Sequence, residues 1–182
     1  MRTGATRQFA MEHTRSGGCI MWRIQLNPDL SSFGYRVVPD SSIALGNLTL
    51  IGPKDINNND RPSTWLQQTD IVFIDNPVGT GFSYVDNRDA YTTDVQQVGK
   101  DLLAWLKDFL NKYPMYRTRP FHIVGESYGG KWTVEFAKIL YEAIQQREVN
   151  MIQFKGVGLG NAWISPIDFN NSYGTYLFGK VK

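Results

Sequence analysis

Apolar residues after Trp65 gather in short runs that polar loops separate. Three such runs occupy residues 71–74, 121–124 and 156–160, and they are rich in β-branched and aromatic residues or in glycine. Runs of this kind predict strands that are buried on both faces of a sheet. The first run ends in Asp75-Asn76-Pro77, which cannot continue a strand ladder.

Between these runs, apolar residues recur at intervals of three and four positions, which predicts two amphipathic helices. Thr92 or Thr93 can cap the first helix, which ends before Pro114, and the second helix begins after Gly130. The predicted buried stripes are Val95, Val98, Leu102, Trp105, Leu106, Phe109 and Leu110 in the first helix, and Trp132, Phe136, Ile139, Leu140, Ala143 and Ile144 in the second.

The order strand, helix, strand, helix, strand predicts an α/β fold with a parallel sheet. Residues 1–32 show no sustained period, so we predict an irregular segment there and leave it unassigned; only the stretch 19–26 favours a strand. Residues 27–62 are rich in turn-forming pairs such as Asn27-Pro28. We place a single domain at residues 33–182.

Composition and charge exclude several classes of protein. The chain of 182 residues is 42% apolar with a net charge of +2, which excludes a disordered tail and does not indicate nucleic acid. No apolar stretch is long enough to cross a membrane, and the first 22 residues lack the apolar run of a signal peptide. The single cysteine, Cys19, excludes an internal disulfide and a cysteine-rich metal site. We expect no metal, no cofactor, and neither a nucleic-acid nor a membrane partner.

Residues 125–129 fit the pattern Gly-x-Ser-x-Gly, with Ser127 at the centre. In a nucleophile elbow, the serine stands on a tight strand-to-helix turn in strained dihedral angles, and glycines on both sides let backbone pass close by. Here a predicted strand precedes the motif and a predicted helix follows it. We therefore expect a positive φ at Ser127, elbow glycines Gly125 and Gly129 that face each other, and residues 75–84 at the same sheet edge. The alternative is a glycine-rich turn that holds a serine by chance.

A serine hydroxyl needs a positioned base to act as a nucleophile at neutral pH. In this architecture the acid and the histidine follow the serine in chain order, but the two histidines, His13 and His122, both precede Ser127. Because His122 lies in the strand that leads into the elbow, we expect a hydrogen-bonded core residue beyond the reach of Ser127. The sequence thus holds a candidate nucleophile without its base.

Three segments, residues 75–84, 125–131 and 158–166, together resemble the serine carboxypeptidases, and most closely their retinoid-inducible or vitellogenic-like branch. The resemblance runs from about Ile51 to the end of the chain and implies an α/β-hydrolase core. Enzymes of this family are more than twice as long, and their Asp and His lie further along. We therefore expect a fragment: a partial α/β-hydrolase core with a mostly parallel sheet that is incomplete at its C-terminal side.

The resemblance also implies roles for individual residues. Ser127 matches the nucleophile that forms the acyl-enzyme, and the backbone N–H of Tyr128 matches one oxyanion donor. Glu126 matches the acid that recognises the terminal carboxylate of a peptide, a pairing of two carboxyl groups that favours acidic conditions. Asn76, in the first of the three segments, is assigned to substrate binding.

One departure from the family concerns its Gly-Gly-Pro-Gly loop, which supplies the other oxyanion N–H. The best alignment places residues 36–42 there, so that Val37, Val38 and Asp40 replace three glycines. Glycine provides positive φ and a close approach of backbone to substrate, and β-branched residues oppose both.

Two functions therefore remain open. The first is a serine-type carboxypeptidase that removes residues from the C-termini of peptides or proteins by acyl transfer through Ser127, with this chain inactive alone. The alternative is a degenerate, non-catalytic homologue that binds peptides or proteins. A lipase or esterase is a third option, which residues 75–84 argue against. The resemblance implies a secreted or lysosomal protein, in agreement with glycosylation sequons at Asn47 and Asn170.

Overall fold

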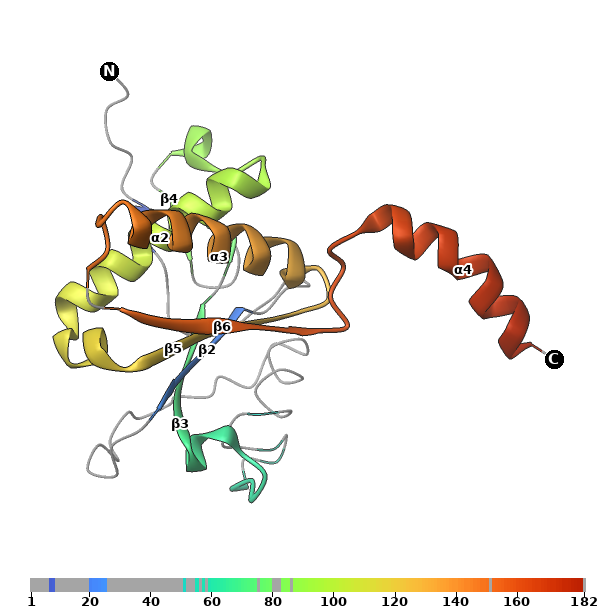
Figure 1. Cartoon of the computed structure of the whole chain (residues 1–182), viewed down its shortest axis with the longest axis horizontal. Coiled ribbons are helices and arrows are strands. Elements are labelled where there is room, and N and C mark those ends of the chain that lie inside the picture. Colours follow the sequence, from blue (N-terminus) through green and yellow to red (C-terminus); the bar gives the residue numbers. More distant parts are fainter. Residues whose placement is uncertain are drawn as a thin grey trace.

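The computed structural model describes residues 7–8, 20–25, 51, 55, 57, 59–74, 76–79, 83–85, 87–150 and 152–181 (Figure 1). In this part of the chain, a four-stranded sheet carries two long helices on one face, and a third helix extends away from the body. A small second sheet pairs β1 (Arg7–Gln8) with β4 (Tyr84–Val85).

The larger sheet has the strand order β3-β2-β5-β6. Its strands are β2 (Ile20–Gln25), β3 (Thr69–Ile74), β5 (Pro120–Glu126) and β6 (Gln153–Gly160). β5 and β6 pair in parallel, whereas β2 pairs antiparallel with both β3 and β5. Three strands therefore run in one direction, and each contains one of the predicted apolar runs.

The mostly parallel sheet is confirmed, and β2 is the one strand of the described sheet that runs in the opposite direction. This strand lies within the stretch 19–26, which favoured a strand, and it separates β3 from β5. A short apolar run indicates that a strand can form, but the partners and direction of the strand depend on packing against distant parts of the chain. The local sequence pattern therefore does not determine which strands pair with β2.

The first long helix, α2 (Val95–Lys112), begins at Asp94. The side chain of Asp94 accepts a hydrogen bond from the backbone N–H of Gln97 at 2.7 Å. The N-cap is thus Asp94, and the prediction of Thr92 or Thr93 is wrong. A carboxylate accepts a hydrogen bond from a free N–H of the first turn, as a threonine hydroxyl can, and its negative charge also complements the helix dipole.

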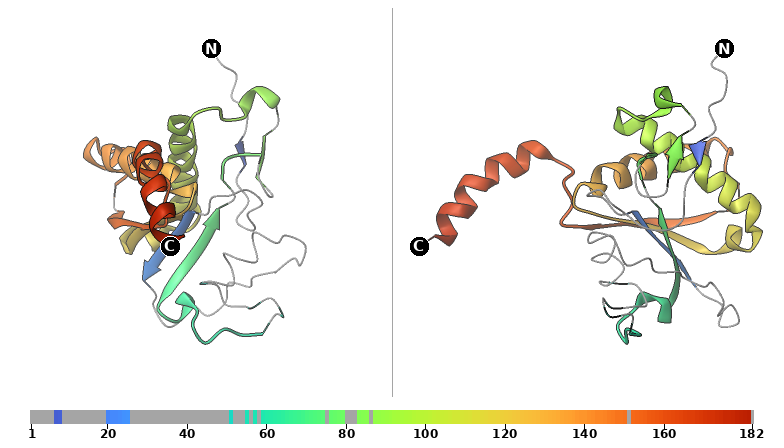
Figure 2. Two further views of the ribbon diagram at one scale, coloured as in Figure 1. Left: turned by 90° about the vertical axis from the view of Figure 1, so that its right-hand side faces the viewer. Right: turned by 180° about the vertical axis from the view of Figure 1, so that it is seen from behind.

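The second long helix, α3 (Gly129–Gln145), packs beside α2 on the same face of the sheet (Figure 2). The two apolar stripes meet each other and the sheet in one core, as predicted. Aromatic rings extend this core, because Phe109 stacks on Trp105 at 5.3 Å and on Tyr116 of η3 (Pro114–Thr118) at 5.4 Å between centroids. Residues that are fully or almost fully buried in the core are Ile74, Leu102, Leu106, Ile123, Phe136 and Leu140.

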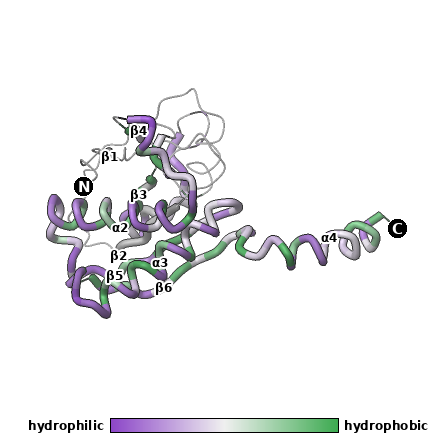
Figure 3. The backbone as a smooth tube through the Cα atoms, turned by 90° about the horizontal axis from the view of Figure 1, so that it is seen from above, coloured by the Kyte–Doolittle hydropathy of each residue, from purple (hydrophilic) through white to green (hydrophobic). Residues whose placement is uncertain are grey.

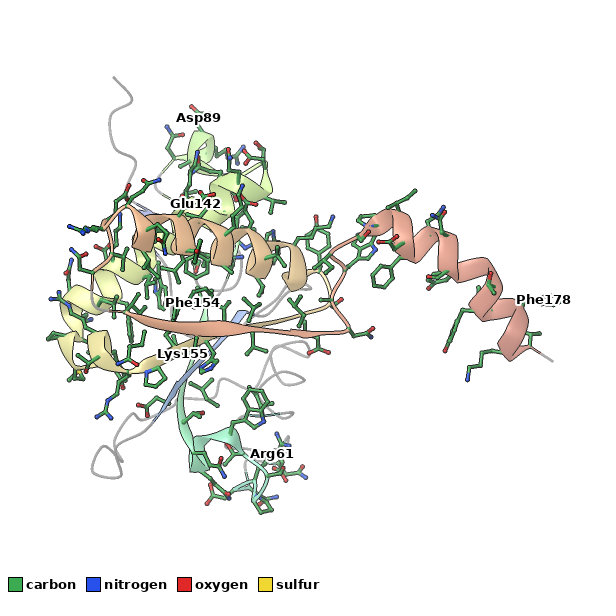
Figure 4. The ribbon with its side chains drawn as sticks, viewed as in Figure 1. Arg61, Asp89, Glu142, Phe154, Lys155 and Phe178 are labelled. Atoms are coloured by element: carbon green, nitrogen blue, oxygen red, sulfur yellow. The ribbon has the colours of Figure 1, made fainter. Side chains whose placement is uncertain are left out.

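Neither β6 nor the last helix, α4 (Pro166–Lys180), contains a buried residue. Apolar and polar positions are mixed along α4, and Phe178 projects into solvent (Figures 3 and 4). Val157 and Leu159 of β6 are exposed as well. Among the described helices, none combines the length and the hydrophobicity that a membrane-spanning segment needs.

Candidate active site

Ser127 lies on a tight turn between the end of β5 at Glu126 and the start of α3 at Gly129. Its φ is +52°, in the left-handed region that non-glycine residues rarely adopt. The side of the sheet at which β5 enters α3 is also the side from which the chain leaves β6 toward α4 (Figure 1). This geometry confirms the predicted strand-to-helix turn and the predicted positive φ at Ser127. Backbone strain of this kind persists only where surrounding contacts hold it, and it clusters at functional sites.

Gly125 provides the space that the elbow needs. A Cβ atom at Gly125 would lie 3.0 Å from the carbonyl oxygen of Gly129 and 2.9 Å from the Cβ atom of Thr133. Gly125 therefore faces Gly129 across the turn, as predicted. A larger residue at position 125 would push α3 away from β5.

Ser127 and Asn76 lie at the same edge of the sheet. Ile74 of β3 and Gly125 of β5 both pair with Ile20 of β2, and Asn76 and Ser127 each follow two residues later. The segment that leaves β3 therefore starts level with the elbow, as predicted. In open α/β sheets, ligands bind outside the carboxyl ends of the strands.

Asn76 is buried beside this edge. Its side chain is 2% exposed, and neither atom of its amide has a hydrogen-bond partner among the described residues. Because roughly 90% or more of buried polar groups in proteins are hydrogen-bonded, this amide retains a capacity to donate and accept that the described residues do not use. Residues 75 and 80–82 lie outside the described part of the chain.

The loop from β6 to α4 is hydrogen-bonded to the elbow. The backbone N–H of Ser127 donates to the carbonyl oxygen of Gly160 at 3.1 Å, and the N–H of Trp163 donates to the carbonyl oxygen of Ser127 at 2.9 Å. A Cβ atom at Gly130 would lie 2.5 Å from that of Ala162, so the loop packs directly on the first turn of α3. Residues 158–166 carry the family resemblance, but this structural support for the elbow was not predicted from them. The glycines of this segment could have revealed the contact, because glycine in a strand often marks a site where another part of the backbone approaches closely.

Glu126 flanks the elbow on the face of the sheet away from the helices. Burial alternates along β5, with Gly125 toward the helices and Glu126 away from them. The side chain is half-buried, and a Cβ atom at Gly160 would lie 3.9 Å from its Cγ. The next residue of that strand end, Asn161, has a φ of +43°. Two adjacent parallel strands, β5 and β6, are thus each followed by a non-glycine residue of left-handed conformation.

Tyr128 follows Ser127 and is the N-cap of α3, with helical angles, φ −60° and ψ −27°. The first N–H groups of a helix have no partner within the helix, and they lie at the positive end of the helix dipole. The backbone N–H of Tyr128 therefore belongs to a group of donors that suits a developing negative charge next to Ser127.

The described residues do not supply a histidine to Ser127. His122 lies five residues earlier on β5, and an extended strand advances about 3.3 Å per residue, so its side chain is beyond hydrogen-bonding reach, as expected. It is half-buried, and its Nδ1 has no hydrogen-bond partner among the described residues, which differs from the expected hydrogen-bonded core histidine. His13 and residues 36–42, the expected position of the glycine loop, lie outside the described part of the chain.

A strained serine between a sheet strand and a helix, with glycine two residues before and two after it, defines the nucleophile elbow of an α/β-hydrolase fold. Comparison with known protein families then identifies the family to which the chain belongs. The model of the serine carboxypeptidase family matches residues 39–181, and the chain belongs to this family. The predicted family and its α/β-hydrolase fold class are thereby confirmed.

Individual relatives agree with this result. The chain is 46% identical over 159 residues to retinoid-inducible serine carboxypeptidase from Mus musculus, a match that covers 87% of this chain and 32% of the relative. The corresponding protein of Homo sapiens is 45% identical over 159 residues, with the same coverage of 87% and 32%. Vitellogenic carboxypeptidase from Aedes aegypti is 34% identical over 144 residues, covering 77% of this chain and 30% of the relative. The chain thus spans about a third of the length of these curated relatives.

Proposed function

We propose that this chain carries the nucleophile of a serine-type carboxypeptidase, which removes residues from the C-termini of peptides or proteins. The φ of +52° at Ser127, on the turn from β5 to α3, carries the proposal together with family membership. The Ser127 hydroxyl attacks the carbonyl carbon of the last peptide bond while a general base, which the described residues do not supply, takes its proton. The C–N bond then breaks, the C-terminal residue leaves as an amine that accepts this proton, and the acyl group stays on Ser127. Water hydrolyses the acyl-enzyme, which releases the shortened peptide and returns a proton to Ser127. The backbone N–H of Tyr128 stabilises the oxyanion that forms in between.

Two side chains at the same sheet edge are our candidates for substrate recognition. Glu126 binds the terminal carboxylate of the peptide, and this contact is favourable when the two carboxyl groups share one proton, hence under acidic conditions. Asn76 offers a buried amide, 2% exposed, to the substrate backbone. A buried amide discriminates well, because a ligand that fails to pair with it leaves a desolvated polar group.

We expect the chain alone to be inactive. Neither of its two histidines follows Ser127 in the sequence, and loss of a triad member leaves only residual catalysis of roughly 10³–10⁴-fold over water. Purified chain incubated with a blocked dipeptide at mildly acidic pH should release no C-terminal residue. Release that Ser127→Ala abolishes would contradict this expectation.

The alternative function is that of a degenerate homologue that binds peptides without cleaving them. The resemblance implies that Val37, Val38 and Asp40 replace the glycines of the family loop that supplies the other oxyanion N–H, and such a replacement favours this alternative. The two functions differ in one respect: whether Ser127 of this chain can act as a nucleophile when a relative supplies the acid and the histidine of the triad.

Two chimeras separate these functions. In the first, residues 51–181 replace the matching segment of the mouse relative, which keeps its own glycine loop. In the second, residues 33–181 do so and also bring in Val37 and Val38. We expect the first chimera to cleave peptides, and the second to lose roughly 10²–10³-fold in kcat, the usual cost of one oxyanion donor.

The control is Ser127→Ala in the first chimera, which should abolish turnover while the melting temperature stays the same. If the first chimera melts like the mouse relative and yet does not react, Ser127 is not a competent nucleophile and the degenerate homologue is favoured. Equal kcat values in the two chimeras would instead show that Val37 and Val38 do not impair the oxyanion hole.

We also propose a secreted or lysosomal location. The sequon at Asn170 supports it, because this residue is exposed on α4 and accessible to modification. Glycosidase treatment of the protein from its native source should increase its mobility on a gel. Unchanged mobility would remove this support.

A further inference from the structure

A lysine bridges two aromatic rings beside the elbow. The Nζ atom of Lys131 lies 4.7 Å from the ring centroid of Tyr128 and 4.5 Å from that of Trp163. Both distances are within the range of about 6 Å at which a cation is attracted to the face of a ring. The Tyr128 ring also lies 5.9 Å from the Trp163 ring and meets Trp132 edge-on at 5.2 Å. Lys131 therefore joins the start of α3 to the loop between β6 and α4.

The position of Lys131 suits such a bridge. It lies in the first turn of α3, three residues after the N-cap Tyr128, so the side chains of Tyr128 and Lys131 are neighbours on the helix surface. The side chain of Lys131 is half-buried, and no ion pair to it is found within the described part of the chain. A lysine can cover apolar rings with its methylene stem while its ammonium group remains near water.

These contacts form a closed ring of interactions that includes Ser127. Tyr128 follows Ser127 in the chain, its ring contacts Lys131, Lys131 contacts Trp163, and the N–H of Trp163 donates to the carbonyl oxygen of Ser127 at 2.9 Å. Tyr128 and Trp163 are each 40% exposed, so burial alone does not fix their rings. The ammonium of Lys131 is the charged member that holds both.

We propose that Lys131 is a positioning residue: it clamps Tyr128 to Trp163 and thereby fixes the peptide unit whose N–H faces the oxyanion. The role in the reaction rests on the proposed function, whereas the clamp itself is a property of this chain. The expected consequence is that a neutral side chain at residue 131 releases Trp163 from the elbow without unfolding α3.

The test on the 182-residue chain measures quenching of tryptophan fluorescence by acrylamide, with the Trp163 contribution taken as the emission lost in Trp163→Phe. Lys131→Met should raise the quenching constant of Trp163, and Lys131→Arg should keep the wild-type value because a guanidinium also binds ring faces. Lys138→Met is the matched control, since this lysine of α3 lies 3.9 Å from Glu135 and has no cation–π contact with any ring in the described part of the chain. It should leave Trp163 unchanged.

Lys131→Gln provides a second neutral variant in case Lys131→Met loses helix content by far-UV circular dichroism. A wild-type quenching constant in a neutral variant that keeps its helix content overturns the clamp. So does an equal rise in Lys138→Met, which would indicate a general effect of charge removal from α3.

A kinetic measurement in the first chimera connects the clamp to the reaction. Lys131→Met should lower kcat about tenfold with KM nearly unchanged, less than the roughly 10²-fold that a 1 Å misplacement can cost, and Lys131→Arg should restore kcat. A raised KM with unchanged kcat overturns the positioning role, because it would place Lys131 in substrate binding. An inactive parent chimera counts against the proposed function alone, since the quenching experiment does not depend on turnover.

Discussion

Gly125 lies directly against Thr133: a Cβ atom added to Gly125 would stand 2.0 Å from the Oγ1 atom of Thr133. Thr133 is fully buried on α3, and as a β-branched residue it has little freedom to turn its side chain away. β5 and α3 therefore meet without spare volume two residues before Ser127. The left-handed turn at Ser127 depends on this contact, because it fixes where α3 can begin.

Gly125→Ala should therefore lower the free energy of unfolding by about 1–3 kcal/mol, the usual cost of overpacking a tight site. Gly160→Ala is the matched control, because among the described residues a Cβ atom there meets only the Cγ of Glu126, at 3.9 Å. Its free energy of unfolding in urea should stay within about 0.5 kcal/mol of the wild type. Equal values for the two variants would show that residue 125 has room for a methyl group.

The N-cap of α2 gives a second test. Asp94→Ala should lower the free energy of unfolding by about 1 kcal/mol, because the N–H of Gln97 loses its acceptor at 2.7 Å. Asp94→Asn should keep most of the stability, since an amide oxygen also accepts this bond. Thr93→Ala serves as the control and should have little effect, because Thr93 is exposed and lies outside the cap. A larger loss in Thr93→Ala than in Asp94→Ala would favour the cap predicted from the sequence.

The features that could be predicted from the sequence depend on patterns within a short stretch of the chain. The apolar stripes of α2 and α3 repeat every three or four residues, and all of their predicted members are buried except Val95, Ile139 and Ile144, which are partly buried. The elbow was predictable because residues 125–129 demand a strand before them and a helix after them, and both patterns are present. The positive φ of Ser127 follows from that context rather than from the motif alone.

The features that could not be predicted depend on contacts distant in sequence. The antiparallel insertion of β2 between β3 and β5 is one example, since a strand pattern does not specify its neighbours. The hydrogen bond from Trp163 to Ser127 and the bridge by Lys131 are others, because they join α3 to a loop some thirty residues later in the chain. Three consecutive residues, Thr92, Thr93 and Asp94, can each cap a helix, so the sequence alone does not show at which of them α2 begins.

Tyr116 should titrate unusually late. Burial, and then the neighbouring Asp70 carboxylate, raises the pKa of Tyr116 from 10.0 to about 12. As the pH rises past 10, the unfolded chain loses this proton while the folded chain keeps it. The stabilising effect is therefore fully present below pH 10 and is lost as the pH rises through about 12.

The measurement compares the wild type with Tyr116→Phe. Tyrosinate absorbance should show a late step near pH 12 in the folded wild type, and that step should be missing from Tyr116→Phe. The free energy of unfolding should also fall less steeply with pH in the variant over the same interval. Identical titration curves for the two proteins would indicate that Tyr116 is not shielded from water as the structure describes.

The apolar surface of β6 and α4 should make the chain bind hydrophobic dyes. Val157 and Leu159 are 43% and 42% exposed on the last strand of the described sheet, and Phe178 is 73% exposed on α4. Contiguous apolar surface at a strand edge favours association and dye binding over stability as a monomer. We therefore expect fluorescence enhancement of anilinonaphthalene sulfonate under native conditions, together with limited solubility.

Threonine substitutions locate the surface that is responsible. Val157→Thr combined with Leu159→Thr should reduce dye binding while the free energy of unfolding changes by no more than about 0.5 kcal/mol per site, because both side chains are exposed and threonine suits a strand. Leu102→Thr, in the fully buried core, should do the reverse and increase dye binding as the protein loses stability. If the wild type melts cooperatively as a monomer and binds no dye, these residues are covered in solution, and the exposed edge at β6 is not a property of the isolated chain.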